Sequence, residues 1–328
     1  MNYEEAKAAF SELFNHKMSD VQMREFLVSL ELNEKTPVHI IAAAAEVMRS
    51  HAIALPIDEQ TRERALDIVG TGGDKIGSFN ISSTTALLSA ACGATVAKHG
   101  SRSITSKSGS ADMFEALGVR LDLGIEKSAR LLEETGFTFM FAQNHHPAMS
   151  FIMPVRKSIP EKTIFNILGP LTNPAGVKKS MLGVFDKAFV PKMLEALKIN
   201  GATSALVVSS AEGMDEIGIT GITYAAQLRD GIVHEFEIDP EQCGIKKMPL
   251  KAILGGDAKE NAHILRNIFD KSATDAQRDI VLINTAASLM VDGLARDMQD
   301  GMEMAREALA NARAKKKLKQ IIEVSNKL

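Results

Sequence analysis

The chain has 328 residues, of which 45% are hydrophobic and 24% are charged, and its formal net charge is -3. This composition is typical of a soluble globular protein with a buried core, and the small negative charge excludes a general attraction to nucleic acid or to acidic membranes. The two cysteines, Cys92 and Cys243, fit neither a metal spacing nor a disulfide framework, which indicates a reducing, cytoplasmic compartment. The start of the chain lacks a secretory signal pattern, and no apolar stretch is long enough to span a bilayer.

The first 55 residues or so predict helices only. Residues 3–14 place their large apolar side chains on one face of a helix. Residues 19–22 have the form of a capping box and open a second helix that runs through Leu30. Thr36 and Pro37 are typical of the N-cap and the first position of a third helix.

After Leu66, short apolar strands alternate with helices, several of which end in glycine. The expected strands cover residues 66–70, 94–100, 137–142, 180–185 and 204–210; the expected helices between them end at Gly93, Gly118 and Gly136, with a further helix over 190–200. A hairpin over 224–228 and 232–238 and helices over 257–270, 275–292 and 300–326 follow. This alternation predicts an α/β fold with a mostly parallel sheet flanked by helices, plus a small all-helical domain.

The segment NILGPLTNPAG, residues 166–176, interrupts the alternation with two prolines and two glycines. We expect it to pass back over the helical domain. The small domain then comprises 1–65 with a returning segment near 166–180, and the large α/β domain comprises 66–165 and 181–328.

The stretch GTGGDKIGSFNISS, residues 70–83, joins an expected strand to an expected helix. Its glycines allow close approach of a ligand to the backbone, and a helix N-terminus favours anions, so the stretch predicts a phosphate cradle. It matches neither a P-loop nor a GxGxxG fingerprint. Asp74 would repel a bare phosphate and suits a sugar hydroxyl or a metal-bound water. The alternative is an ordinary strand-to-helix turn.

The stretch KHGSRSITSKSGSAD, residues 98–112, follows the next expected strand. Because the carboxyl ends of parallel strands meet at one edge of a sheet, the two stretches are expected to face the same crevice. Two such loops favour a ligand with more than one phosphate, while a solvated charged loop is the alternative for the second stretch.

Asp215 and Glu216 follow a third strand and supply adjacent oxygen ligands of the kind that Mg²⁺ prefers, although acidic pairs are also common on surfaces. Arg156 is flanked by apolar residues and suits capture of a small carboxylate, with a surface ion pair as the alternative. Adjacent His145 and His146 point apart on a helix and make a weak case for a metal site. The lysines near residues 315–319 favour a solvated helix end over a nucleic-acid patch.

These stretches, in this order, resemble the motifs of the anthranilate phosphoribosyltransferase family. The family's GTGGD, KHG…SGSAD, HPAM…PVR…TIFN-x-LGPLTNP and GxDE motifs stand here as GTGGDKIGSFNISS, KHGSRSITSKSGSAD, HPAMSFIMPVRKSIPEKTIFNILGPLTNP and GMDE. The resemblance covers nearly the whole chain. It implies transfer of phosphoribose from phosphoribosyl pyrophosphate to anthranilate, a small helical domain beside a large α/β domain, and a homodimer joined through the helical domains.

The resemblance also implies the residues of the site. Those that hold phosphoribosyl pyrophosphate are Gly70, Gly73, Asp74, Ser78, Asn80, Ile81, Ser82, Ser83, Lys98, His99, Gly100, Ser101, Arg102, Ser103, Ile104, Thr105, Ser106 and Ser110. Anthranilate is expected beside Gly70, Ser101 and Arg156. Ser82, Asp215 and Glu216 are expected to position two Mg²⁺ ions.

This sequence departs from the family pattern at three positions. Ser101 stands where Asn usually follows KHG, so a contact to anthranilate becomes shorter or water-bridged. Lys75 replaces a usual Gly, and Gly218 replaces a common Ser after DEI.

The implied reaction needs no acid, base or nucleophile from the protein, because an aromatic amine is already neutral and pyrophosphate leaves readily once Mg²⁺ neutralises it. His99 could act as a base, but loop packing or a phosphate contact is the preferred interpretation. A pyrimidine nucleoside phosphorylase-like enzyme and a non-catalytic nucleic-acid-binding relative remain the alternatives. The first should not need the Asp215–Glu216 pair, and the second should be basic and lack it.

Overall fold

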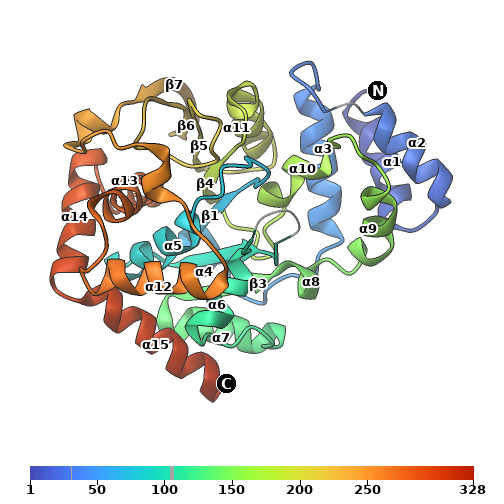
Figure 1. The fold of residues 1–328 in the computed structure, drawn as a ribbon. Coiled ribbons are helices and arrows are strands. Elements are labelled where there is room, and N and C mark those ends of the chain that lie inside the picture. The colour runs from blue at the N-terminus through green and yellow to red at the C-terminus, as the bar shows by residue number, and fades with distance from the viewer. Residues whose placement is uncertain (31, 104–106) are drawn as a thin grey trace.

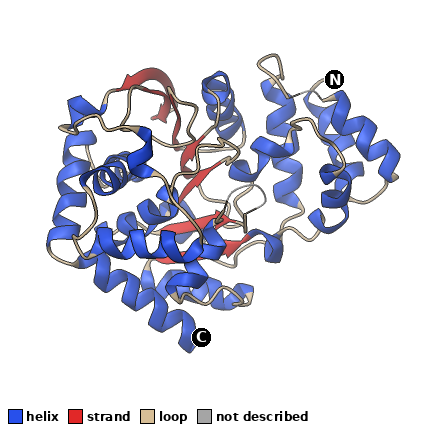
Figure 2. Cartoon of the chain, viewed as in Figure 1, coloured by secondary structure: helices blue, strands red, loops and turns tan. Residues whose placement is uncertain are grey.

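The computed structural model describes residues 1–30, 32–103 and 107–328. An all-helical part, which the beginning of the chain forms, lies beside a larger part that contains the sheet (Figure 1). In the larger part helices surround most of the strands, while the last strands of the chain lie at the edge of the molecule (Figure 2). The expected fold class, α/β with a small all-helical domain, is confirmed.

The helical part begins with α1 (Tyr3–Phe14), α2 (Asp20–Ser29) and α3 (Val38–Ser50). The capping box expected at the second helix is confirmed, because the side chains and backbone N–H groups of Ser19 and Gln22 bond reciprocally. The N-cap expected at Thr36 is wrong, since Pro37 occupies that position of α3. The Thr36 hydroxyl instead accepts a hydrogen bond from the Asn33 N–H at 2.9 Å and closes the preceding turn.

Seven strands form one sheet in the order β3-β2-β1-β4-β5-β6-β7. Their bounds are β1 (Leu66–Gly70), β2 (Val96–Gly100), β3 (Phe137–Phe141), β4 (Lys179–Gly183), β5 (Ser204–Ser210), β6 (Thr223–Arg229) and β7 (Ile232–Ile238). The first five strands are parallel, and β6 and β7 form the expected antiparallel hairpin. The chain runs outward from β1 to β3 and then returns to β4 on the other side of β1. The carboxyl ends of β1 and β4 therefore form a topological switch point, where open α/β sheets bind ligands.

Helices surround the sheet. The helices of this part include α4 (Glu59–Arg64), α5 (Ile81–Cys92), α6 (Ser110–Leu117), α7 (Ile125–Thr135), α11 (Val190–Ile199), α12 (Ala258–Phe269) and α13 (Asp275–Asp292). α5 and α13 pack on each other and on the strands from one side, while α11 packs on β5 and β6 and also against α3. Gly93, Gly118 and Gly136 end α5, α6 and α7 at φ angles of 111°, 92° and 71°, as expected for left-handed helix caps. In the described part of the chain, no helix is both long enough and apolar enough to cross a membrane.

The single helix expected over residues 300–326 is wrong. α14 (Met298–Ala310) and α15 (Arg313–Lys327) are separate, and Ala312 between them adopts a left-handed φ of 56°. The break allows α14 to pack on α13 and α5 while α15 packs on α5 and α7. Tertiary burial of the two apolar faces outweighs helix propensity here, and neither glycine nor proline marks the turn.

The chain between β3 and β4 lies against the helical part. It contains α8 (Ala142–His145), α9 (Met149–Lys157) and α10 (Phe165–Leu168). α9, which has Pro154 inside it and which the sequence analysis did not predict, contacts α2. Ile164, Phe165 and Leu168 belong to one buried cluster with side chains of α1 and α3, and this cluster continues to β4, β5 and α11. The helical and α/β parts therefore share a continuous apolar core.

Candidate active site

The glycine-rich stretch lies at the carboxyl end of β1, at the switch point. The Thr71 N–H donates to the Gly183 carbonyl at the end of β4, at 3.0 Å. Four residues between 72 and 77 have positive φ, and Lys75 (φ 60°) is the one that is not glycine. Left-handed residues of this kind occur in backbone loops that hold phosphates. At the other end of the loop, the Gly255 N–H donates to the Gly77 carbonyl at 2.9 Å.

The acidic pair predicted as a metal site lies against this loop. Asp215 Oδ2 accepts from the Gly72 N–H at 2.7 Å, and Glu216 Oε1 accepts from the Ser82 N–H at 2.9 Å. Ser82 belongs to the first turn of α5, so the glutamate lies at the positive end of that helix. A Cβ added to Gly70 would overlap the Asp215 side chain. The structure therefore brings together residues that are more than 130 positions apart in the sequence.

Lys98, in the middle of β2, lies near the acids. Its side chain is 1% exposed, and its ammonium donates to the Ile68 carbonyl and, at 3.3 Å, to the Ser82 hydroxyl. Burial lowers the pKa of Lys98, while Asp67, Glu216 and Asp215 oppose that shift.

The carboxylates of Asp74, Asp215 and Glu216 together carry more negative charge than Lys98 alone can balance. Burial and the charge of Asp74 raise the pKa of Asp215 to about 6. Burial, together with Asp215, raises the pKa of Glu216 well above its usual range, and Lys98 offsets only part of this rise. Three neighbouring carboxylates with hard oxygen donors, beside a loop suited to phosphates, fit a divalent cation such as Mg²⁺.

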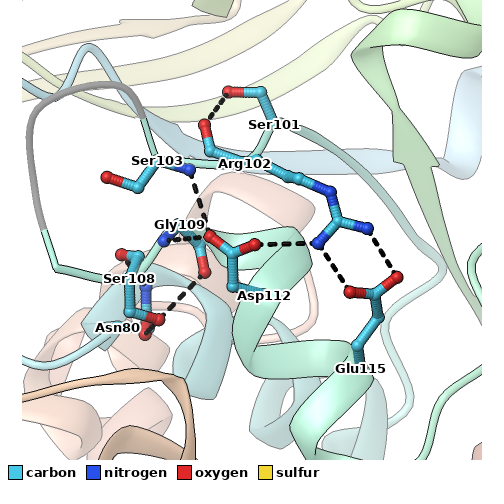
Figure 3. Close-up of polar contacts among 8 residues, drawn as sticks. All are labelled: Asn80, Ser101, Arg102, Ser103, Ser108, Gly109, Asp112 and Glu115. Carbon is cyan, nitrogen blue, oxygen red and sulfur yellow. Dashed lines mark hydrogen bonds and ion pairs between the residues drawn. The ribbon is translucent and has the colours of Figure 1, made fainter.

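The second predicted loop leaves β2 and enters α6 (Figure 3). The Arg102 guanidinium is paired with Asp112 at 2.8 Å and Glu115 at 2.6 Å, both on α6. Asp112 also accepts from the N–H groups of Gly109 and Ser103, at 2.9 and 3.1 Å. Arg102 therefore fixes the loop to its own helix in this structure, although it was predicted to contact the donor.

The remaining predicted residues of this loop are distributed around its two ends. Ser101 is exposed, and its hydroxyl donates to the Arg102 carbonyl at 3.1 Å. Gly100 lies so close to the Ser110 hydroxyl, at the start of α6, that an added Cβ would collide with it. The predicted donor residues Ile104, Thr105 and Ser106 lie outside the described residues.

Asn80 connects the two loops. Its amide donates to the Ser108 carbonyl at 3.3 Å, and its side-chain oxygen accepts from the Asn261 amide at 2.8 Å. Asn261, on α12, is 2% exposed and also accepts from the Gly256 N–H at 2.8 Å. Nothing in the sequence points to Asn261 as a site residue, because it lies 181 positions from Asn80 and belongs to no motif.

Other predicted donor residues line or underlie the first loop. Gly73 and Asp74 lie in the turn, and Asp74 accepts from the Ile76 N–H at 3.1 Å. Ser78 forms an isolated bridge to Leu254. Ile81 and Ser83 are each 1% exposed, in the first turn of α5.

Arg156, near the end of α9, has a partly buried guanidinium. It lies 5.8 Å from the Phe165 ring centre, and its nearest polar partner is the Met153 sulfur at 3.9 Å. In the ranges that the structure describes, no carboxylate pairs with it. A cation without a protein counter-ion can hold the carboxylate of a ligand.

The histidines next to these loops are buried. His99 and His146 face each other with ring centres 5.1 Å apart, and burial and the nearby histidines hold the pKa of His99 well below its usual range. His145 instead bonds to the Ile53 carbonyl at 2.7 Å. His99 is therefore a neutral imidazole 4% exposed, which suits a packing role rather than that of an accessible base.

The fold and the site together define a glycosyl transferase with two characteristic domains. The family model described as "Glycosyl transferase family, helical bundle domain" matches residues 1–52, and that described as "Glycosyl transferase family, a/b domain" matches residues 62–315.

Curated relatives and solved structures narrow this class. The chain is 43% identical to the anthranilate phosphoribosyltransferase of Xanthobacter autotrophicus, over 99% of this chain and 93% of that protein. It is 42% identical to that of Methanobrevibacter smithii, over 99% and 96%. The crystal structure of anthranilate phosphoribosyltransferase from Thermus thermophilus has a TM-score of 0.93 at 38% identity, over 99% of this chain and 96% of that one. The Saccharomyces cerevisiae enzyme "in complex with PRPP and Mg" has a TM-score of 0.86 at 25% identity, over 99% and 93%. The chain belongs to the anthranilate phosphoribosyltransferase family.

Proposed function

We propose that this protein transfers the 5-phosphoribosyl group of phosphoribosyl pyrophosphate to the amine of anthranilate, releases pyrophosphate and serves tryptophan biosynthesis. The observation that carries the proposal is the meeting of the glycine-rich loop, buried Lys98 and the pair Asp215–Glu216 at the switch point of the sheet. Membership of the family and a relative named as a complex with PRPP and Mg support the same substrates.

The donor is assigned to the two loops that leave β1 and β2. The glycine-rich backbone of residues 70–77 and the N-terminus of α5 suit its phosphate groups. The Lys98 ammonium, which already donates to Ser82, lies beside the assigned metal ligands and adds a positive charge there. These groups stabilise charge that develops on the departing pyrophosphate.

Mg²⁺ is assigned to Ser82, Asp215 and Glu216, with two ions per site. The excess of carboxylates over Lys98 supports a divalent cation at this position, and the relative bound to PRPP and Mg supports its identity. When bound, Mg²⁺ neutralises the negative charge of the leaving group.

Anthranilate is assigned to the side of the crevice that faces the helical part. The Arg156 guanidinium would hold its carboxylate, and Gly70 and Ser101 would border it. Fixing amine and ribose in line can supply about 7–11 kcal/mol of the barrier reduction, so no protein acid or base is required. The buried, neutral state of His99 is consistent with that view.

The same proposal includes the assembly, the compartment and the division into domains. We assign 1–65 with the returning segment 166–180 to the helical domain and the rest to the α/β domain, because Ile167 and Leu168 share a core with α1 and α3. We assign a homodimer through the helical domains, where α2 leaves Val21 65% and Val28 44% exposed. The cytoplasm is the proposed compartment.

The test is the loss of anthranilate fluorescence after addition of phosphoribosyl pyrophosphate and Mg²⁺. The wild type should consume anthranilate, whereas Asp215→Ala with Glu216→Ala should abolish Mg²⁺-dependent turnover. A matched control is Asp239→Ala with Glu241→Ala, an acidic pair that bonds to Lys247 on the surface and should leave the rate unchanged. Absence of fluorescence loss, with phosphorolysis of pyrimidine nucleosides instead, would favour the alternative enzyme.

A further inference from the structure

Asp67, the second residue of β1, is a fully buried carboxylate that the proposed mechanism does not use. Its side chain is 0% exposed. Oδ1 accepts from the His99 N–H at 3.1 Å, and Oδ2 accepts from the Asn173 amide at 2.7 Å. An ionised carboxylate in a core is costly to stability, so its retention calls for a reason other than packing.

The first bond joins Asp67 to the beginning of the second donor loop. His99 follows Lys98 and is the last residue but one of β2, which ends at Gly100. The contact with Asp67 therefore holds the carboxyl end of β2, from which Gly100 and Ser101 lead into the loop.

The second bond joins Asp67 to the segment that crosses between the two parts of the molecule. The Asn173 amide donates to Asp67 and, at 2.9 Å, to the Ala97 carbonyl, while its oxygen accepts from the Ala175 N–H at 2.8 Å. The neighbouring Pro174 carbonyl accepts from the Leu55 N–H at 3.1 Å, in the connection from the helical part. Asp67 thus ties the crossing segment to the sheet directly behind the donor loop.

Asp67 also balances the charge of Lys98. The carboxylates that act on this lysine are Asp67, Glu216 and Asp215. The last two are the assigned Mg²⁺ ligands, so bound metal neutralises them. Asp67, which is fully buried and is not a metal ligand, then remains the lysine's counter-charge.

We propose that Asp67 is a positioning residue for donor binding, which holds Lys98, the start of the donor loop and the crossing segment in one arrangement. This inference rests on the proposed function, because it concerns the same donor site. Asp67 touches neither substrate, so its contribution appears as affinity for phosphoribosyl pyrophosphate rather than for anthranilate.

The test compares Asp67→Asn with Asp292→Asn. The asparagine of the first variant keeps the shape of the side chain but offers one oxygen to two N–H donors and no charge to Lys98. Asp292 is a matched control, since its side chain is 9% exposed and pairs with Lys179 at 3.4 Å, and Lys179 lies at the amino end of β4, away from the two donor loops. Binding of phosphoribosyl pyrophosphate with Mg²⁺ is measured by calorimetry without anthranilate, and KM is measured for both substrates.

We expect Asp67→Asn to raise the donor Kd and KM about tenfold, which corresponds to about 1.4 kcal/mol, and to leave the anthranilate KM within about twofold. Asp292→Asn should leave both unchanged. The proposal would be overturned if Asp67→Asn raised the KM for both substrates equally. It would also be overturned if Asp67→Asn bound the donor as tightly as Asp292→Asn does. If Asp67→Asn does not fold, the variant Asn173→Ala tests the proposal in its place. It removes the hydrogen bond from Asn173 to Asp67 but keeps the charge of Asp67. It should raise the donor KM by a smaller factor than Asp67→Asn and leave the anthranilate KM unchanged. A wild type that binds the donor but consumes no anthranilate contradicts the proposed function alone.

Discussion

Replacement of Asp215 by asparagine should stabilise the protein while it removes the activity. Burial and the charge of Asp74 raise the pKa of Asp215 from 3.8 to about 6. A difference of about two pKa units corresponds to about 3 kcal/mol between the protonation states, which is an upper bound for this partly exposed side chain. The asparagine oxygen can still accept the hydrogen bond that the Gly72 N–H donates to Asp215 at 2.7 Å.

The sign of the effect depends on pH. Because the folded-state pKa of Asp215 is raised, the folded protein binds more protons than the unfolded chain between about pH 4 and pH 6, and its stability falls as pH rises through this window. Above about pH 6 the full cost of the buried charge is present. Asp215→Asn should therefore gain up to about 3 kcal/mol at pH 7.5 and almost nothing at pH 4.

The assay is urea unfolding of wild type and variant at both pH values with EDTA present, so that no bound metal contributes. Asp112→Asn is the control of opposite sign, since hydrogen bonds and Arg102 hold the pKa of Asp112 below its ordinary value despite burial. That variant should lose stability at pH 7.5. A variant Asp215→Asn no more stable than the wild type at pH 7.5 would refute the burial argument. Retained Mg²⁺-dependent turnover would refute the metal assignment.

Further predictions concern the surrounding loops. Gly183→Ala should lower kcat/KM by roughly tenfold or more, because its Cβ would overlap the Asp215 backbone, whereas Gly169→Ala, with no atom within 4 Å of an added Cβ, should keep the rate. Lys75→Gly should raise the free energy of unfolding in urea by about 0.5–1 kcal/mol, since φ at Lys75 is 60°. Ser101→Asn should lower the anthranilate KM about two- to tenfold, as one added hydrogen bond would, with the donor KM unchanged; a change in the donor KM instead would contradict the placement of this loop.

The alternation of strands and helices along the chain and the positions of the loops follow from local signals. Apolar strands that end in glycine and polar residues predict where each chain segment leaves the sheet, so the first loop, the second loop and the acidic pair could be assigned to one crevice. Gly93 and Gly118 end their helices as expected because only the left-handed region permits the turn. These features depend on a few neighbouring residues.

Features that depend on distant partners could not be predicted. The turn at Ala312 lets α14 pack on α13 and α15 pack on α7, while both pack on α5, and Asn311 at the end of α14 is a weak local signal for it. Arg102 was assigned to the donor by its motif, but the structure pairs it with Glu115, thirteen positions away on α6. Asp67 did carry a signal, since a charge inside an apolar strand is unusual, but its partner Asn173 lies 106 positions further along the chain.

β4 lies between β5 and β1, so the acidic pair that follows β5 must reach past the end of β4 to contact the glycine-rich loop that follows β1. Gly70 and Gly183 are register partners at the ends of β1 and β4, and a Cβ on either would overlap Asp215. Two adjacent glycines therefore remove the side chains that would block the path from the end of β5 to the Gly72 N–H. Neither glycine has a positive φ, so conformational freedom does not explain them. Their place is determined by the approach of a carboxylate from two strands away, which gives the glycine in the middle of SMLGVF a role in the site rather than in a turn.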